Sequence, residues 1–209
     1  THFANADTLA SGQTEQQLGR FRVLQEVLAG ELGEPVPDSL ANSAAILAWP
    51  EAAGTWMRPG IALYGSSPFG RQSAAFFGLQ PVMTLHARLI AVHEVPAGES
   101  VGYSRKFRAE KPTRTATIPI GYADGIPRSW GNEKGYVMIN NQKATILGNI
   151  CMDMMMINVD NIANAKEGDT VTVFNAKPSL KEFAGYCKTI TYEVLTSISP
   201  RVKRIYIKN

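Results

Sequence analysis

The sequence has 209 residues, of which 44% are hydrophobic and 19% are charged. These values are typical of a globular chain that forms one large domain or two smaller ones. The formal net charge of +3 is too small and too scattered to indicate binding to nucleic acid or to a membrane surface. No apolar run approaches the roughly 18–20 residues of a membrane-spanning helix, and no signal peptide is visible. Cys151 and Cys187 occur in unlike settings, which favours reduced thiols in a cytoplasmic protein.

The first part of the chain begins with a strand-like end at Thr1–Ala4 and continues into a helical pattern. Apolar residues at spacings of three and four predict an amphipathic helix over residues 14–32, whose apolar side is expected to pack. These residues are Leu18, Phe21, Leu24, Leu28 and Leu32. Gly33, Pro35 and Pro37 then predict a loop.

Asn42 and Ser43 stand before a helical run that continues to Ala48, so both are candidate N-cap residues. A cap is a sufficient structural reason for Ser43, but a hydroxyl at a helix N-terminus also forms an anion site. Gly60 is a second candidate, because a residue without a Cβ lets a phosphate approach the backbone closely. Strand, helix, cap and strand in this order suggest the end of a (β/α)8 barrel, where phosphate sites commonly follow the last strands.

Residues 66–80 are rich in Gly, Ser and Pro and are predicted to form a linker, with a domain boundary between residues 79 and 80. The first domain, residues 1–79, is predicted to be α/β, and the second, residues 80–209, to be all-β. One long strand is predicted over residues 84–95, on which His86 and His93 face opposite sides. This spacing argues against a shared metal ion, and no other metal-ligand cluster is visible.

Short strands separated by turns predict a β-barrel or sandwich in the second domain. The predicted strands cover residues 115–120, 136–139, 144–147, 170–174 and 201–207, the last as a closing strand with alternating charge. A helix capped by Ser179 is predicted over residues 179–187, and another begins near residue 190. Cys151 beside Asp153 is a weak candidate nucleophile, since no histidine accompanies it in this half of the chain.

Two tyrosines lie next to glycines at the ends of strand-like runs. The stretches are Val101-Gly102-Tyr103-Ser104 and Ile118-Pro119-Ile120-Gly121-Tyr122-Ala123-Asp124-Gly125. A phenol has a pKa of about 10, so it acts as a base only where nearby cations and excluded water favour phenolate. The simpler role is packing at a turn. The residue sequence of both stretches, however, resembles that of alanine racemase, the fold-type III enzyme that uses pyridoxal 5'-phosphate (PLP).

The resemblance covers the whole chain and implies a role for each matching residue. Tyr103 matches the base on one face of the substrate, Tyr122 matches the narrow entrance to the same pocket, and Met152 matches a contact to the substrate carboxylate. Residues that match the cofactor site are His2, Asn42, Ser43, Arg58, Gly60, Ile61 and Tyr192. Among these, Arg58 matches the arginine at the pyridine nitrogen, His2 its hydrogen-bond partner, and Tyr192 a phosphate ligand. Residues that match the pocket entrance are Asp7, Arg128 and Asp153.

Part of the family pattern is not found in this sequence. Residues 1–105 contain no lysine, so no PLP Schiff base can form there, and the abrupt change in composition suggests a join near Tyr103. The family's cofactor lysine and the arginine that pairs with the substrate carboxylate belong upstream of the motifs found. The chain therefore resembles the C-terminal part of an alanine racemase and is expected to be inactive alone. Asn149 stands where many members have an arginine, which leaves the substrate range open.

The resemblance implies that the complete protein interconverts L- and D-alanine, for peptidoglycan, with Tyr103 and the absent lysine as bases on opposite faces of the substrate. It implies a homodimer in which Tyr103, Tyr122 and Met152 serve the cofactor of the partner subunit. Two alternatives stay open. One is a racemase of broader specificity, which Asn149 favours, and the other is a β-domain that dimerises and binds without catalysis.

Overall fold

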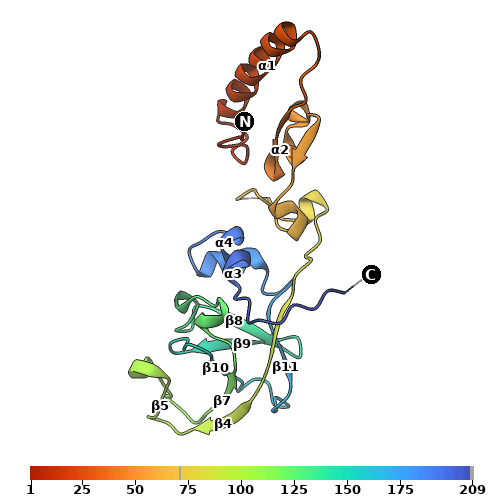
Figure 1. The fold of residues 1–209 in the computed structure, drawn as a ribbon. Helices are drawn as coiled ribbons and strands as arrows, with labels where there is room; N and C mark the ends of the chain where they lie inside the picture. The colour runs from red at the N-terminus through yellow and green to blue at the C-terminus, as the bar shows by residue number, and fades with distance from the viewer. Residues whose placement is uncertain (71, 208–209) are drawn as a thin grey trace. The chain divides into compact units, whose positions relative to one another are not determined.

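The computed structural model describes residues 1–70 and 72–207. The chain divides into two compact units, Thr1–Val82 and Met83–Asn209. The first unit carries helices around a small parallel sheet, and the second is built on a curled antiparallel sheet (Figure 1). The predicted class, α/β elements followed by a β-domain, is confirmed. None of the helices in the described residues combines the length and the hydropathy that crossing a membrane requires.

The first unit begins with a long helix, α1, that spans Gln13–Leu32, in agreement with the helix predicted over residues 14–32. The helix ends because Gly33 takes a left-handed conformation, φ 74°, and its N–H bonds to the carbonyl of Ala29. The elements that follow are β1 (Ser39–Asn42), α2 (Ser43–Ala48), η1 (Pro50–Ala52), β2 (Trp56–Arg58), η2 (Ile61–Tyr64) and η3 (Ala75–Phe77). Strands β1 and β2 pair in parallel, which brings Asn42 opposite Arg58.

The core of the first unit lies between α2, the N-terminal segment and the start of α1. Its buried residues include Phe3, Leu18, Leu40, Ala45, Trp49 and Phe69. The expectation that the whole apolar side of α1 packs is wrong, because Leu24, Leu28 and Leu32 are 62%, 47% and 64% exposed. A helix of this length is about 30 Å long, and the two short strands of this unit are too small to cover it.

The second unit contains seven antiparallel strands in the order β3-β11-β8-β9-β10-β7-β4. They are β3 (Leu85–Arg88), β4 (Ala91–Val95), β7 (Thr113–Ile118), β8 (Tyr136–Ile139), β9 (Gln142–Leu147), β10 (Met155–Asn158) and β11 (Thr170–Phe174). A separate hairpin pairs β5 (Ser100–Val101) with β6 (Phe107–Arg108). Short 3-10 turns lie at η4 (Tyr103–Arg105), η5 (Tyr122–Asp124) and η6 (Arg128–Trp130).

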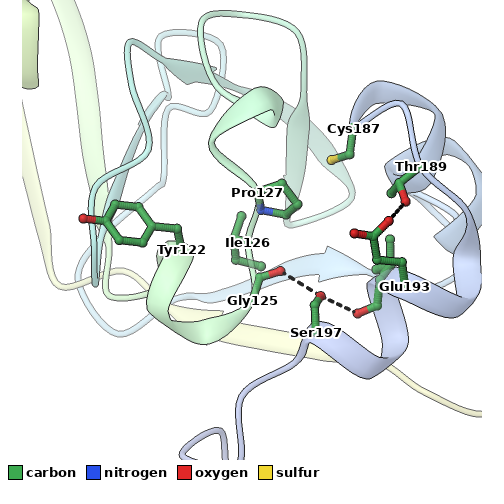
Figure 2. A pocket seen from close by; sticks show the side chains of 9 residues that line it. Tyr122, Gly125, Ile126, Pro127, Cys187, Thr189, Glu193 and Ser197 are labelled. Carbon is green, nitrogen blue, oxygen red and sulfur yellow. Dashed lines mark hydrogen bonds between the residues drawn. The ribbon is translucent and has the colours of Figure 1, made fainter.

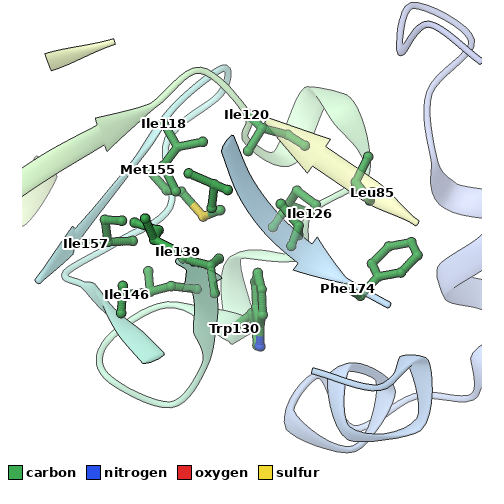
Figure 3. Packing of buried hydrophobic residues seen from close by; sticks show 14 of the residues in the cluster. Leu85, Ile118, Ile120, Ile126, Trp130, Ile139, Ile146, Met155, Ile157 and Phe174 are labelled. Carbon is green, nitrogen blue, oxygen red and sulfur yellow. The ribbon is translucent and has the colours of Figure 1, made fainter. Parts of the chain in front are cut away.

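Buried aliphatic side chains fill the concave side of this sheet, as Figure 3 shows for Ile118, Ile139 and Met155. Helices α3 (Leu180–Tyr186) and α4 (Thr191–Ser197) pack against one another, and α3 also contacts η6. Aromatic contacts join α3 to the core, with the ring of Phe183 centred 4.4 Å from Trp130 and 5.6 Å from Phe174. The predicted cap of α3 is confirmed, since the Ser179 hydroxyl accepts the Glu182 N–H at 3.1 Å.

Two predicted strands of the second unit are wrong. The run 84–95 is two strands, because the chain bends at Leu89 and Ile90, whose N–H groups bond to the carbonyls of Asp169 and Thr117 respectively. As a result His86 pairs opposite Thr172 and His93 opposite Thr115, on different strands of the sheet. Residues 201–207 form no strand, and Ile205 to Ile207 are exposed. Arg204 donates to the carbonyl of Ile198 at 2.8 Å, so its side chain bonds to residues earlier in the same segment and not to a neighbouring strand.

Candidate active site

The first group of predicted site residues gathers around Arg58, at the end of β2. Its guanidinium donates to the carbonyls of Thr1 at 2.7 Å, Ser39 at 2.8 Å and Leu40 at 3.3 Å, and also to the Ser39 hydroxyl. Its Nη2 lies 3.2 Å from Nδ1 of His2. Because a guanidinium only donates, Nδ1 of His2 is the acceptor, and a neutral His2 carries its hydrogen on Nε2. The structure thus brings Arg58 and His2 together, as the family pattern implies.

Asn42 and Ser43 have different structural roles at the start of α2. Only Asn42 caps the helix, since its side-chain oxygen accepts the Ala45 N–H at 3.1 Å. The expectation that Ser43 is also a cap is wrong, because Ser43 is the first helical residue. Its buried hydroxyl oxygen instead accepts two backbone N–H groups from the next segment, that of Gly60 at 2.8 Å and that of Ala62 at 3.3 Å.

This arrangement leaves donors available around Ser43. Within the described residues the hydroxyl hydrogen of Ser43 and the backbone N–H of Ile61 bond to no acceptor. Gly60 borders the same place, and a Cβ there would lie 3.8 Å from the Ser43 hydroxyl oxygen. A hydroxyl and backbone N–H groups with little side-chain cover are the donors that a phosphate group takes in proteins. The residues present therefore fit the phosphate of PLP.

The second group lies in the second unit, where two loops are joined. The N–H groups of Tyr122 and Ala123 donate to the carbonyls of Cys151 and Met152, at 3.0 and 2.8 Å. Gly121 is required at this contact, because a Cβ would lie 2.6 Å from the Met152 carbonyl oxygen. Tyr122 and Met152, predicted as substrate contacts 30 residues apart in the sequence, are thus presented by one rigid junction. The Met152 N–H itself bonds to no acceptor within the described residues.

Asp124 stabilises this junction and was not among the predicted site residues. Its carboxylate accepts the Gly121 N–H at 2.8 Å and the Arg201 Nε–H at 2.6 Å. Burial acts to raise the pKa of Asp124, but the hydrogen bonds from Arg201 and Gly121 and the arginine's charge outweigh it, so the pKa lies below the ordinary value. Its place between Gly121 and Gly125, two residues after Tyr122, was a signal in the sequence; nothing marked Arg201.

Tyr103 opens the turn η4 and is 73% exposed. Gly102 before it has φ 75°, and a Cβ there would lie 2.8 Å from the Met156 side chain, so only glycine fits this turn without strain. The Asn149 side chain donates to the Tyr103 carbonyl at 3.0 Å and accepts from the Asn132 side chain at 3.0 Å. The position where the family pattern expects an arginine therefore holds the backbone of the predicted base.

The three predicted entrance residues are all exposed. Asp7 belongs to the first unit and follows Ala6, whose carbonyl accepts the buried Trp49 indole N–H at 2.9 Å. Arg128 begins η6 in the second unit. Asp153 follows Met152, and its charge acts on Arg201. The structure places Arg128 and Asp153 in the unit that holds Tyr122, but no contact between these two side chains is recorded among the described residues.

Tyr192 lies in the first turn of α4 and is 44% exposed. Beside α4 is a cavity of about 290 Å³ (Figure 2). Its lining residues are Tyr122, Gly125, Ile126, Pro127, Cys187, Thr189, Glu193, Val194 and Ser197. Burial, with the charge of Glu193 adding to it, raises the pKa of the Cys187 thiol against a hydrogen bond to Ser129, so Cys187 is a poor nucleophile at neutral pH. In the described residues no three His, Cys, Asp or Glu side chains are placed to hold a metal ion.

Comparison with known families gives matches along both units. The sequence model of the alanine racemase N-terminal domain matches residues 1–68, and that of the C-terminal domain matches residues 82–206. The chain is 44% identical over 207 residues to an alanine racemase of Stutzerimonas stutzeri (strain A1501), covering 99% of this chain and 56% of the relative. This chain therefore spans little more than half the length of the curated relatives that it matches.

Solved structures agree with these matches. The crystal structure of the biosynthetic alanine racemase from Pseudomonas aeruginosa superposes with a TM-score of 0.85 at 42% identity, over 99% of this chain and 56% of that one. The alanine racemase of Clostridium difficile 630 in complex with cycloserine gives a TM-score of 0.92 at 33% identity, over 100% of this chain and 56% of that one.

Proposed function

Because this chain belongs to the alanine racemase family, we propose that it forms the C-terminal part of a PLP-dependent racemase that interconverts L- and D-alanine. The observation that carries the proposal is the Ser43 hydroxyl, buried and bonded to the Gly60 and Ala62 N–H groups. It organises a set of donors suited to a phosphate at the end of the barrel-like unit. When bound, PLP supplies a conjugated ring that withdraws electrons from the α-carbon of the amino acid attached to it.

Residues of the first unit would hold this cofactor. Ser43 and Ile61 supply donors to the phosphate, and Gly60, whose own N–H bonds to Ser43, lets the phosphate approach the backbone closely. Asn42 fixes the start of α2, on which Ser43 lies. The family pattern assigns Tyr192 to the same phosphate. Arg58 would donate to the pyridine nitrogen and, because a guanidinium only donates hydrogen bonds, would keep a proton off that atom. Its backbone acceptors and His2 hold the guanidinium in place. An unprotonated ring withdraws electrons less strongly from the α-carbon. This would favour return of the α-proton over side reactions of the amino acid.

Residues of the second unit would act on the substrate. The Tyr103 hydroxyl oxygen takes the α-proton from L-alanine on one face. A lysine in the N-terminal barrel segment, absent from this sequence, does the same for D-alanine on the opposite face. The free N–H of Met152 binds the substrate carboxylate, and Tyr122, with Asp7, Arg128 and Asp153, narrows the entrance. In the proposed homodimer, Tyr103, Tyr122 and Met152 serve the cofactor of the partner subunit. The cytoplasmic location of the protein remains a prediction from its composition.

Hydrogen exchange at the α-carbon tests this assignment in the full-length protein, in which this chain follows its N-terminal barrel segment. Tyr103→Phe keeps the ring and deletes only the hydroxyl, so we expect turnover to fall about 10²–10⁴-fold, the usual contribution of a positioned acid or base. In deuterated solvent the variant should lose α-proton exchange from L-alanine far more than from D-alanine. PLP binding should remain, because Tyr103 is assigned no contact to the cofactor.

Tyr122→Phe is the matched control, since it deletes the same hydroxyl from another exposed tyrosine of this unit. It should change KM and substrate range more than exchange. Equal exchange of both enantiomers by Tyr103→Phe would show that Tyr103 is not the base for L-alanine. A wild-type protein that binds PLP and racemises larger amino acids equally well would favour the broader specificity. A protein that neither binds PLP nor racemises amino acids would favour the alternative of a non-catalytic β-domain.

A further inference from the structure

The Asp124 carboxylate joins two segments of the second unit. It is buried, and each of its two oxygens has its own partner, Gly121 N–H within its loop and Arg201 Nε–H far along the chain. The Asp124 carbonyl also accepts the Ser199 N–H at 3.1 Å. A buried carboxylate is stable only when it is paired and hydrogen-bonded. The arrangement therefore fixes the loop Gly121–Gly125 against the segment Ser199–Arg201.

The same loop is fixed on its other side to the residues before β10. Tyr122 and Ala123 donate from consecutive N–H groups to consecutive carbonyls, those of Cys151 and Met152. Two parallel bonds of this kind allow neither loop to shift without the other. Whatever holds Asp124 in place consequently holds both Tyr122 and Met152.

The loop also meets the C-terminal end of α4. The Ser197 hydroxyl bonds to the carbonyls of Val194 at 2.9 Å and Gly125 at 3.4 Å, as Figure 2 shows. Gly125 has φ 103°, and a Cβ there would lie 2.8 Å from the Ser197 carbonyl carbon. The backbones are therefore in direct contact. Helix α4 carries Tyr192 in its first turn, so the Asp124 junction links the loop of Tyr122 to the helix of Tyr192.

We propose that Asp124 is a positioning residue, which with Arg201 fixes Tyr122 and Met152 in place relative to the helix that carries Tyr192. The inference rests on the proposed function for the roles of those three residues, and on the hydrogen bonds of this chain for the link between them. Asp124 touches no substrate in this scheme. It acts through the loop Gly121–Gly125, so its loss should displace Tyr122 and Met152 from their positions at the substrate.

Asp124→Asn in the full-length protein tests the role, because asparagine keeps the size of the side chain and removes the charge that pairs with Arg201. We expect KM for alanine to rise about tenfold or more, the value of one charge-assisted hydrogen bond. The change in kcat should be smaller, since Tyr103 is held separately by Asn149. The amide hydrogens of Tyr122 and Ala123 should exchange with solvent at least tenfold faster, on the same basis.

Asp160→Asn is the matched control. Asp160 also accepts a backbone N–H, that of Arg114 at 2.6 Å, and pairs with Lys111, but it lies after β10 and away from the loop of Tyr122. It should leave the exchange of Tyr122 and Ala123 and the KM unchanged. Arg201→Gln, which leaves the bond between Asp124 and Gly121 possible, should give an intermediate effect and serves as a second variant if Asp124→Asn does not fold.

The amide exchange is independent of activity, so the two hypotheses fail separately. A full-length protein without racemase activity overturns the proposed function, while the exchange rates still decide the role of Asp124. Unchanged exchange at Tyr122 and Ala123 in both Asp124→Asn and Arg201→Gln would overturn the positioning role. So would a fall in kcat with KM unaltered, because the substrate contacts would then be in place.

Discussion

The side-chain amide of Asn149 donates a 3.0 Å hydrogen bond to the backbone carbonyl of Tyr103, 46 residues earlier in the chain. The oxygen of the same amide accepts from Asn132, so Asn149 joins the β8–β9 side of the sheet to the turn of the predicted base. An uncharged side chain at this position thus holds the Tyr103 turn through its backbone.

Asn149→Ala should therefore lower α-proton exchange from L-alanine in the full-length protein. Loss of one exposed hydrogen bond has a net value of about 0.5–1.5 kcal/mol, so we expect a reduction of about two- to tenfold, with exchange from D-alanine affected less. Asn158→Ala, which removes a side chain that bonds to the Asp160 N–H, is the control. Equal losses for the two enantiomers would contradict a role at Tyr103.

Ser43→Ala should weaken PLP binding. The variant removes the acceptor of the Gly60 and Ala62 N–H groups and the hydroxyl donor to the phosphate. A hydrogen bond to a charged group contributes roughly 1.5–3 kcal/mol, which corresponds to about a 10- to 100-fold higher Kd for PLP, measured by absorbance titration of the full-length protein. Ser67→Ala removes a hydroxyl that accepts the Phe69 N–H in the same unit and should leave the Kd unchanged. Equal values of Kd for Ser43→Ala and wild type would rule out this phosphate site.

The second unit should lose stability in acid. The pKa of Glu182 lies below its ordinary value, chiefly because its carboxylate accepts the Ser179 N–H. Hydrogen bonds from the Ser179 and Tyr136 hydroxyls and the charge of Lys143 act in the same direction, while burial opposes them. The pKa of Asp124 is also lowered, despite its burial. A carboxylate whose pKa falls on folding stabilises the folded state above its unfolded pKa, and this stabilisation disappears as pH falls through the folded pKa.

The expected melting temperature is nearly constant from pH 7 to about pH 5 and falls below about pH 4, where these carboxylates titrate. Circular dichroism melts between pH 3 and pH 7 measure it, with the approximate limits taken from ordinary carboxyl pKa values. In the double variant Asp124→Asn, Glu182→Gln, the melting temperature at pH 7 should be lower and its decline in acid shallower. An undiminished decline would mean that other carboxylates dominate the acid response.

The 209-residue chain alone should not racemise alanine. Its ten lysines all lie between residues 106 and 208, so the first unit, with Ser43 and Arg58, has no lysine side chain that can react with the PLP aldehyde. Incubation with PLP, borohydride reduction and peptide mapping should give only partial labelling spread over several lysines. One stoichiometric adduct together with racemase activity would refute this prediction.

Local pattern predicted the elements whose boundaries depend on nearby residues. The 3.6-residue periodicity gave α1, and the spacing of Ser179 and Glu182 gave the cap of α3. The burial of α1 was not predictable in the same way. An apolar residue such as Leu28 is buried only if another element covers it, and periodicity contains no information about that element.

Long-range partners decided the elements that were mispredicted. The run 84–95 has the composition of a strand throughout, and the bend at Leu89 is set by Asp169, about 80 residues later. Residues 201–207 alternate like a strand, yet Arg201 pairs with Asp124 and Arg204 with a nearby carbonyl. Likewise the sequence motifs identified Tyr122 and Met152 as candidates. The Asp124 carboxylate, which joins their loops to Arg201, could be recognised only in the folded chain.

The bend at Leu89 also determines the order in which the sheet can be assembled. Strand β4 can pair with β7 once residue 118 has been synthesised, but β3 must wait for β11, and Thr170 is opposite Arg88, 82 residues further along the chain. Contacts so distant in sequence slow folding. Until Thr170–Phe174 emerges from the ribosome, the backbone of β3 remains an unpaired edge, the kind of surface through which nascent chains associate with one another.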